Sequence, residues 1–126
     1  VELEFDSTYL VVRKSRMAIA TSGTVTLETA LIGTPQIVCY KASGLNYRLG
    51  RMFIKVSFLS PVNLILKNEV VPELIQNDLN VEQLLKKSNE IIDGGESRQM
   101  AEFRRLHLTL RSASASKSVA ALLLSK

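Results

Sequence analysis

The chain has 126 residues, of which 46% are hydrophobic and 22% are charged; this composition excludes a disordered or fibrous protein and fits one domain. Its net charge of +4 suits an anionic ligand or an anionic membrane surface, but it is too small to indicate nucleic-acid binding. One cysteine excludes a disulfide framework, and no apolar run reaches the roughly 18 residues of a membrane span. Because the first residue is Val1 and not Met, we expect the chain to be a piece of a longer protein.

The N-terminal stretch is predicted to form a strand, a helix and a second strand. Apolar and acidic residues alternate over Val1–Phe5, which indicates a strand. A helix is predicted over Thr8–Lys14, with Leu10 and Val11 facing the core. The uncharged apolar run Met17–Ala20 is typical of a strand that is covered on both faces, as in a parallel sheet.

The turn after this strand carries the clearest indication of a ligand. Ser22, Gly23 and Thr24 precede a predicted helix over Val25–Ile32, and Ser22 or Thr24 is expected to cap that helix. Gly23 can adopt backbone angles that are closed to other residues, and it lets a ligand approach the main chain. Since the free N–H groups and the dipole at a helix start favour phosphate or another anion, we expect an anion site at this junction.

Glu28 is the acidic residue nearest to this junction. It is expected in the first turn of the helix, but counted from Thr24 it comes one residue too late for a capping box. Its carboxylate would then be able to accept hydrogen bonds from a sugar diol such as a ribose. The alternative is a surface acid that interacts favourably with the dipole of its own helix.

The following residues complete a β-α-β-α-β pattern. The helix is predicted to end at Gly33, with Pro35 just beyond, and Gln36–Tyr40 is predicted to be the next strand. Right-handed connections between these elements would give a parallel sheet with its ligand at the carboxyl ends of the strands.

A basic, apolar helix is predicted over Ala42–Lys55. Arg48, Arg51 and Lys55 would share one side of this helix. They form either a solvated face or a contact with an anionic membrane.

The region from Val56 to Gln76 is less regular. Pro61 argues against a long element, so Val56–Leu66 is predicted to be a short strand or loop followed by an apolar return. Asn63 stands among apolar neighbours, and its buried amide would be hydrogen-bonded either to backbone or to a ligand. A short helix is predicted to begin at Pro72.

The C-terminal part is predicted to be helical. Asn80 would cap a helix over Val81–Ile92 that buries Leu84, Leu85 and Ile91, and further helices are predicted over Glu96–Arg111 and Val119–Leu124. The single histidine, His107, is expected at the surface, and Cys39 in the core. No grouping of ligand types indicates a metal, so neither a metal nor a cofactor is expected.

Three ordered segments resemble one family. These are SGTVTLETALIGTPQIVCY at 22–40, followed by Lys41, then SPVNLI at 60–65 and NEVVPELIQ at 68–76. Together they are similar to the C-terminal part of lipid-A-disaccharide synthases. The resemblance implies the GT-B fold, so the expected class is α/β: a Rossmann-like parallel sheet with flanking helices, ending in several helices. Residues 1–126 would be one partial, UDP-sugar-binding domain without the N-terminal acceptor domain, and the helices of 81–126 would pack on the sheet or on a partner chain.

The resemblance also implies a reaction and a site. A glycosyltransferase of this family joins a UDP-linked acylated glucosamine to an acylated glucosamine 1-phosphate, giving the lipid A disaccharide precursor and UDP. The family's Ser-Gly-Thr turn falls on Ser22, Gly23 and Thr24, which implies contact with the diphosphate. Its acidic residue falls on Glu28, implying contact with the ribose, and its activity-linked asparagine falls on Asn63, which is expected to act in catalysis and in UDP binding. The catalytic base is expected in the missing N-terminal part.

The resemblance places the whole enzyme in the cytoplasm, peripheral to the inner membrane. Two possible partners stay open: an anionic membrane surface, and a second copy of the chain in a homodimer through the C-terminal helices. Two other functions also stay open: a non-catalytic fragment that binds a nucleotide or associates with itself, and a UDP-sugar epimerase of the same fold. The chain departs from the family where a small residue, Gly and Arg usually follow the apolar return, because it has Leu66, Lys67 and Asn68 there.

Overall fold

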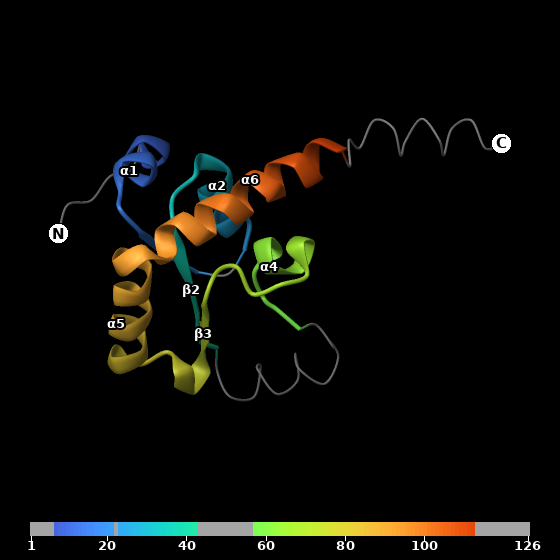
Figure 1. Cartoon of the computed structure of the whole chain (residues 1–126). Helices are drawn as coiled ribbons and strands as arrows, with labels where there is room; N and C mark the ends of the chain where they lie inside the picture. The colour runs from blue at the N-terminus through green and yellow to red at the C-terminus, as the bar shows by residue number, and fades with distance from the viewer. Residues whose placement is uncertain (1–6, 22, 43–56, 113–126) are drawn as a thin grey trace.

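The computed structural model describes residues 7–21, 23–42 and 57–112 of the chain (Figure 1). The predicted strand at 1–5, the predicted helix beyond Ala42 with its three basic residues, and the predicted helix at 119–124 lie outside these residues. The described elements, in chain order, are α1 (Thr8–Lys14), β1 (Ala18–Thr21), α2 (Thr24–Ile32), β2 (Gln36–Tyr40), α4 (Pro61–Leu66), β3 (Glu73–Ile75), η1 (Gln76–Asp78), α5 (Val81–Glu90), η2 (Ile91–Gly95) and α6 (Glu96–Ser112).

The three described strands form one parallel sheet in the order β1-β2-β3. Ala18 pairs with Gln36 at the start of the β1–β2 ladder, and Tyr40 pairs with Ile75 at the end of the β2–β3 ladder. The predicted α/β class with a parallel sheet is therefore confirmed. Because the strands are parallel, their carboxyl ends lie at one edge of the sheet, and β2 and β3 end toward the bottom of Figure 1.

β2 is buried on both of its faces. Val38 points into a core formed with α2, α4 and α6, whose largest buried residues are Phe103 and Leu106. Ile37 and Cys39 point to the opposite face, where they pack with Leu74, Ile91 and Leu84. Side chains alternate between the two faces of a strand, and both faces of β2 are covered. The middle of this strand is therefore a continuous apolar run.

β1 is less covered than its sequence predicts. Ala20 is buried, but the side chain of Ile19 is 56% exposed. Ile19 pairs with Ile37 and so faces the same side of the sheet, where α5 covers β2 and β3 and leaves β1 open. The prediction of a strand is confirmed, whereas the prediction of cover on both faces is wrong for this residue.

α1 begins and ends as predicted, but its inward residue differs. Leu10 and Val11 are 57% and 47% exposed, so the prediction that they face the core is wrong. Val12 lies on the inner side, where its carbonyl accepts a hydrogen bond from Thr34 Oγ1 at 2.8 Å. A two-turn helix on the surface offers too few periodic positions to fix which side is buried.

The segment that begins at Pro72 forms a strand and not the predicted helix. Val38 N donates to Pro72 O at 2.9 Å, and Val38 and Glu73 are partners in the ladder. Leu74 is buried against the sheet face that α5 covers. Pro72 and Glu73 resemble a helix start locally, but pairing with β2 buries this segment and decides its conformation.

The residues before Leu66 form the helix α4, whereas the sequence predicted a strand or loop followed by an apolar return. Pro61 is its first residue, where a missing N–H costs no hydrogen bond, and Ser60 Oγ accepts from Val62 N at 3.2 Å. Gly33, by contrast, ends α2 as predicted, with φ of 89° in the left-handed region and its N–H bonded to Thr29 and Ala30 carbonyls.

Lys67 ends α4 in the left-handed region, with φ of 54°. The sequence resemblance implies glycine at this position, and a left-handed lysine carries a steric penalty that glycine lacks. We expect Lys67→Gly to raise the free energy of unfolding by about 1 kcal/mol, measured by urea denaturation. Asn68→Gly, at the exposed neighbouring residue, is the control, and an equal gain there would contradict this explanation.

The C-terminal helices follow their predicted order. Asn80 caps α5, since its Oδ1 accepts from Gln83 N at 2.9 Å, and the chain bends at Gly94, where φ is 131°. Ile91 is buried as predicted and Leu84 packs beside it, but Leu85 is 58% exposed, so its predicted burial is wrong.

α6 crosses in front of β2 and packs on α2 and α4 (Figure 1). Its buried Gln99 acts like an added strand residue: Gln36 N donates to Gln99 Oε1 at 2.9 Å, and Gln99 Nε2 donates to Gln36 O at 3.1 Å. No helix in the described ranges has the length and apolarity needed to cross a membrane.

Candidate functional site

The junction of β1 and α2 has a backbone that requires glycine. β1 ends at Thr21, and Gly23 follows with φ of 132° and ψ of −164°, a combination open only to glycine. A Cβ placed on Gly23 would meet no atom within 4 Å, so the space beside it is open. The expected special conformation of this glycine is confirmed.

The cap of α2 differs from the prediction. Gly23 itself is the N-cap residue and Thr24 is the first helical residue, so Thr24 does not cap the helix. Ser22 lies outside the described residues. Thr26 instead stabilises the turn, because both its N–H and its Oγ1 donate to Gly23 O, at 3.2 Å and 2.7 Å.

The start of α2 carries no acidic residue in its first turn. Its partial positive charge is therefore not offset from within that turn. The start of α4 is different: Leu59 N donates to Glu73 Oε2 at 2.8 Å, and Ser60 N donates to Glu73 Oε1 at 2.9 Å. A carboxylate of the protein thus already occupies the start of α4, which leaves the start of α2 as the better place for an anionic ligand.

Glu28 lies one residue further into its helix than expected. Counted from the Gly23 cap it is the fifth helical residue, so the prediction that it lies in the first turn is wrong. This position weakens its interaction with the helix dipole, which falls off within the first turn. The side chain is exposed, and Tyr9 OH donates to its Oε2 at 3.3 Å. Its Oε1 makes no hydrogen bond with the described residues, so it can accept from a ligand.

Asn63 is fully buried, and protein groups use its whole amide. Its Nδ2 donates to Val71 O and to Glu73 Oε1, each at 2.8 Å. Its Oδ1 accepts from Val70 N at 2.8 Å and from Val71 N at 3.0 Å. An amide has two donors and two acceptor positions, so none is left for a ligand. Of the two alternatives from the sequence, the structure favours bonding within the protein over contact with a ligand.

The predicted site residues therefore separate into two groups. Gly23, Thr24 and Glu28 share one strand–helix unit at the carboxyl edge, whereas Asn63 lies inside α4, which packs against α2. Sequence reasoning missed Glu73, the partner of Asn63. The signal for it was an acid in the otherwise apolar run VVPELI, since such an acid needs hydrogen-bond donors nearby.

Other reactive side chains lie away from this junction. His107 is exposed as expected, with its Nε2 3.0 Å from Leu31 O. Cys39 is buried as expected, and desolvation raises the pKa of its thiol. Within the described residues, no group of three His, Cys, Asp or Glu side chains could hold a metal ion.

One cavity of about 270 Å³ lies at the opposite end of the sheet. It is lined by both acids and bases, including Glu69, Glu90, Lys87 and Arg98. Pro72, which also lines it, precedes β3, so the cavity lies toward the amino ends of the strands and not beside Gly23.

The comparison with known families covers nearly the whole chain: the model of the family described as lipid-A-disaccharide synthetase matches residues 2–125. The chain belongs to this family. Lipid-A-disaccharide synthases from several bacteria are similar to it. That of Syntrophus aciditrophicus is 41% identical over 108 residues, covering 86% of the chain and 28% of the relative. That of Colwellia psychrerythraea is 36% identical over 129 residues, covering 100% and 33%. That of Solibacter usitatus is 41% identical over 85 residues, covering 68% and 22%.

The chain thus spans about a fifth to a third of the length of these synthases. The resemblance inferred from the three motifs is confirmed. The described residues of this family member form an α/β unit with a parallel sheet. Its strand β1 leads into the start of α2, where the backbone at Gly23 requires glycine.

Proposed function

We propose that the chain is the UDP-binding part of a glycosyltransferase. The whole enzyme would join a UDP-linked acylated glucosamine to an acylated glucosamine 1-phosphate, forming the lipid A disaccharide precursor and UDP. Family membership supports the reaction class. The observation that carries the nucleotide site is the Gly23 junction, where an acid-free helix start follows a parallel strand at its carboxyl end.

The proposed chemistry is a displacement at the anomeric carbon of the donor sugar. A hydroxyl oxygen of the acceptor forms the new bond to this carbon, while the bond from the carbon to the diphosphate oxygen breaks. The hydroxyl proton passes to a base that we expect outside this chain. N–H groups at the start of α2 would stabilise the negative charge that develops on the departing UDP, and would hold the donor in place.

We assign the roles as follows. Ser22, Gly23 and Thr24 contact the diphosphate, and Glu28 accepts hydrogen bonds from the ribose. Because the amide of Asn63 is saturated, its proposed contribution is positional: it joins α4, which packs on α2, to the backbone of Val70 and Val71. This replaces the expected direct role in catalysis and in UDP contact.

Three ligands test the proposed site in the purified chain. Titration calorimetry with UDP, UMP and uridine should give the tightest binding for UDP, with affinity lost as each phosphate is removed. Equal affinities for UDP and uridine would show that the helix start does not bind the diphosphate. The isolated chain is expected to transfer no sugar, because it would lack the N-terminal acceptor domain and the catalytic base.

The Glu28→Ala substitution tests the ribose contact. We expect UDP to bind about tenfold more weakly, since one hydrogen-bonding carboxylate at an exposed position is lost. The matched ligand is 2′-deoxy-UDP, which lacks one ribose hydroxyl. Its affinity should change less on substitution than that of UDP, and calorimetry measures both. The same loss for both ligands would place Glu28 away from the 2′-hydroxyl.

Tyr9→Phe is the control at the neighbouring residue. It removes the hydrogen bond to Glu28 Oε2 and leaves the carboxylate in place. We expect UDP affinity to be retained or slightly raised, because the carboxylate then has no competing donor from Tyr9.

The remaining proposals concern the whole protein. A peripheral position on the cytoplasmic face of the inner membrane is supported by the net charge of +4, which favours an anionic surface. A homodimer through the C-terminal helices is a further proposal. Membership of the synthetase family favours sugar transfer over the epimerase alternative.

A further inference from the structure

Gln76 forms a two-point contact with the backbone that follows β2. Its Nε2 donates to Ala42 O and its Oε1 accepts from Ala42 N, each at 3.1 Å. The β2–β3 ladder ends at the pair Tyr40 and Ile75, so the Gln76 side chain continues the pairing after the strands separate. The amide group replaces the backbone of a strand partner.

Gln76 makes this contact from a backbone conformation that is unfavourable for a residue other than glycine. Its φ is 54°, and Lys67 is the other non-glycine residue with positive φ in the described ranges. Glycine would adopt this conformation without steric penalty, so backbone geometry alone does not explain a glutamine here. The hydrogen-bonding side chain is the feature that glycine lacks.

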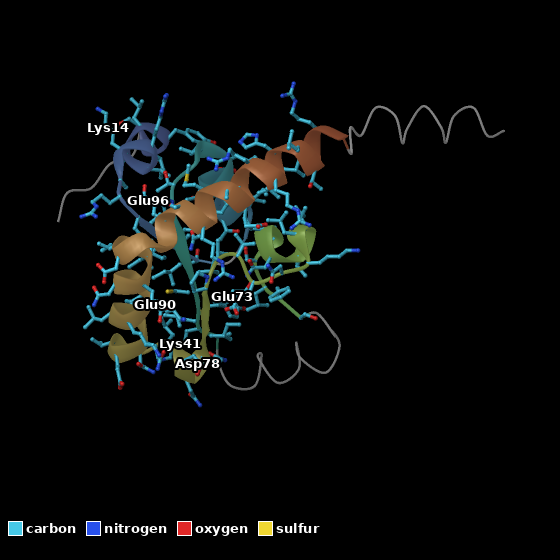
Figure 2. The ribbon with its side chains drawn as sticks, in the orientation of Figure 1. Lys14, Lys41, Glu73, Asp78, Glu90 and Glu96 are labelled. Atoms are coloured by element: carbon cyan, nitrogen blue, oxygen red, sulfur yellow. The ribbon has the colours of Figure 1, made fainter. Side chains whose placement is uncertain are left out.

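The residues held by Gln76 lie beside the candidate nucleotide site. β1 and β2 are neighbours, and Thr21 pairs with Cys39, so Lys41 and Ala42 extend β2 past the level at which β1 gives way to Gly23. Lys41 and Asp78, which flank the contact, both lie at the carboxyl end of the sheet in Figure 2. Ligands of parallel α/β sheets bind at this edge.

β3 also holds the chain where it enters α4. Glu73, labelled on β3 in Figure 2, accepts from Leu59 N and Ser60 N. The connection between β2 and α4 is therefore held at both of its described ends, at Ala42 by Gln76 of η1 and at Leu59 by Glu73 of β3.

We propose that Gln76 is a positioning residue for the donor nucleotide: its side-chain amide fixes the Ala42 backbone at the carboxyl edge before UDP binds. The inference rests on the proposed UDP site. A backbone that is ordered in advance loses less conformational entropy on binding, so the contact increases affinity without touching the ligand.

The test separates affinity from stability. Gln76→Gly removes two hydrogen bonds to Ala42 but also the steric penalty of positive φ. These two effects oppose each other, so the free energy of unfolding should stay near that of wild type, while UDP binds about fivefold more weakly. The Ala42 amide should also exchange its hydrogen faster in NMR. Gln76→Glu is the second variant: it keeps the side-chain length but has no donor for Ala42 O, and should also bind UDP more weakly.

Lys67→Gly is the matched control, because it replaces the other left-handed residue and should leave UDP affinity unchanged. All titrations are made at a temperature at which circular dichroism shows each variant folded. Unchanged affinity in Gln76→Gly, with wild type binding UDP, overturns the positioning role alone. A wild-type chain that does not bind UDP overturns the proposed function and this inference with it.

Discussion

Replacing Asn63 with alanine is expected to destabilise the chain by about 4 kcal/mol, a large part of the stability of a small domain. The substitution leaves the N–H groups of Val70 and Val71 and the carbonyl of Val71 without their partner. These groups are buried, so water cannot replace the lost hydrogen bonds. Urea denaturation followed by circular dichroism measures the loss.

Asn68→Ala is the matched control, because Asn68 is an exposed asparagine five residues along the chain. Its loss should stay within about 0.5 kcal/mol. Similar losses for the two variants would mean that the network around Asn63 adds nothing beyond an ordinary asparagine.

Asn63→Asp probes the same network through pH. An aspartate can still accept from Val70 N and Val71 N, but at neutral pH it would place a second carboxylate against Glu73 Oε1 and Val71 O. Repulsion would raise the pKa of the introduced acid above that of the unfolded chain. A raised pKa means that the protonated form favours folding, so the loss of stability relative to wild type should shrink as the pH falls through the carboxyl range.

The sequence predicted the order and bounds of the helices and strands up to β2 well, because local signals and long-range packing agree on them. Gln36–Tyr40 has an apolar, β-branched middle, and it forms the central strand with both faces covered. Gly33 stops α2 in the left-handed conformation that a glycine allows. Each of these features follows from residues close together in the chain.

The errors arise where distant residues decide. β3 has only three residues, and its conformation depends on β2, which lies more than thirty positions earlier. The position of Glu28 within α2 was misjudged because the cap is Gly23, identified by backbone angles and not by a capping side chain. The sequence could not show that the amide of Asn63 is fully hydrogen-bonded. One of its partners is the carboxylate of Glu73, which comes close to Asn63 only when β3 joins the sheet.

Gly23→Ala is expected to weaken UDP binding about thirtyfold and to lower stability by about 2 kcal/mol. A Cβ on Gly23 would meet no atom within 4 Å, so the change acts through the backbone and not through a clash. An alanine cannot hold φ of 132° with ψ of −164° at low energy. The chain would relax toward negative φ and turn the first N–H groups of α2 away from the position that we propose for the diphosphate.

Gly33→Ala is the control at the other end of the same helix. Gly33 also has positive φ, 89°, and a Cβ there would lie 3.3 Å from Met100 Cε, so this variant should likewise lose about 1 to 2 kcal/mol of stability. Its UDP affinity should stay that of wild type, because the start of α2 is untouched. Calorimetry on the two variants therefore separates the loss of an anion site from a general weakening of α2. Retained affinity in Gly23→Ala, or an equal loss in both variants, would remove the helix start from the proposed site.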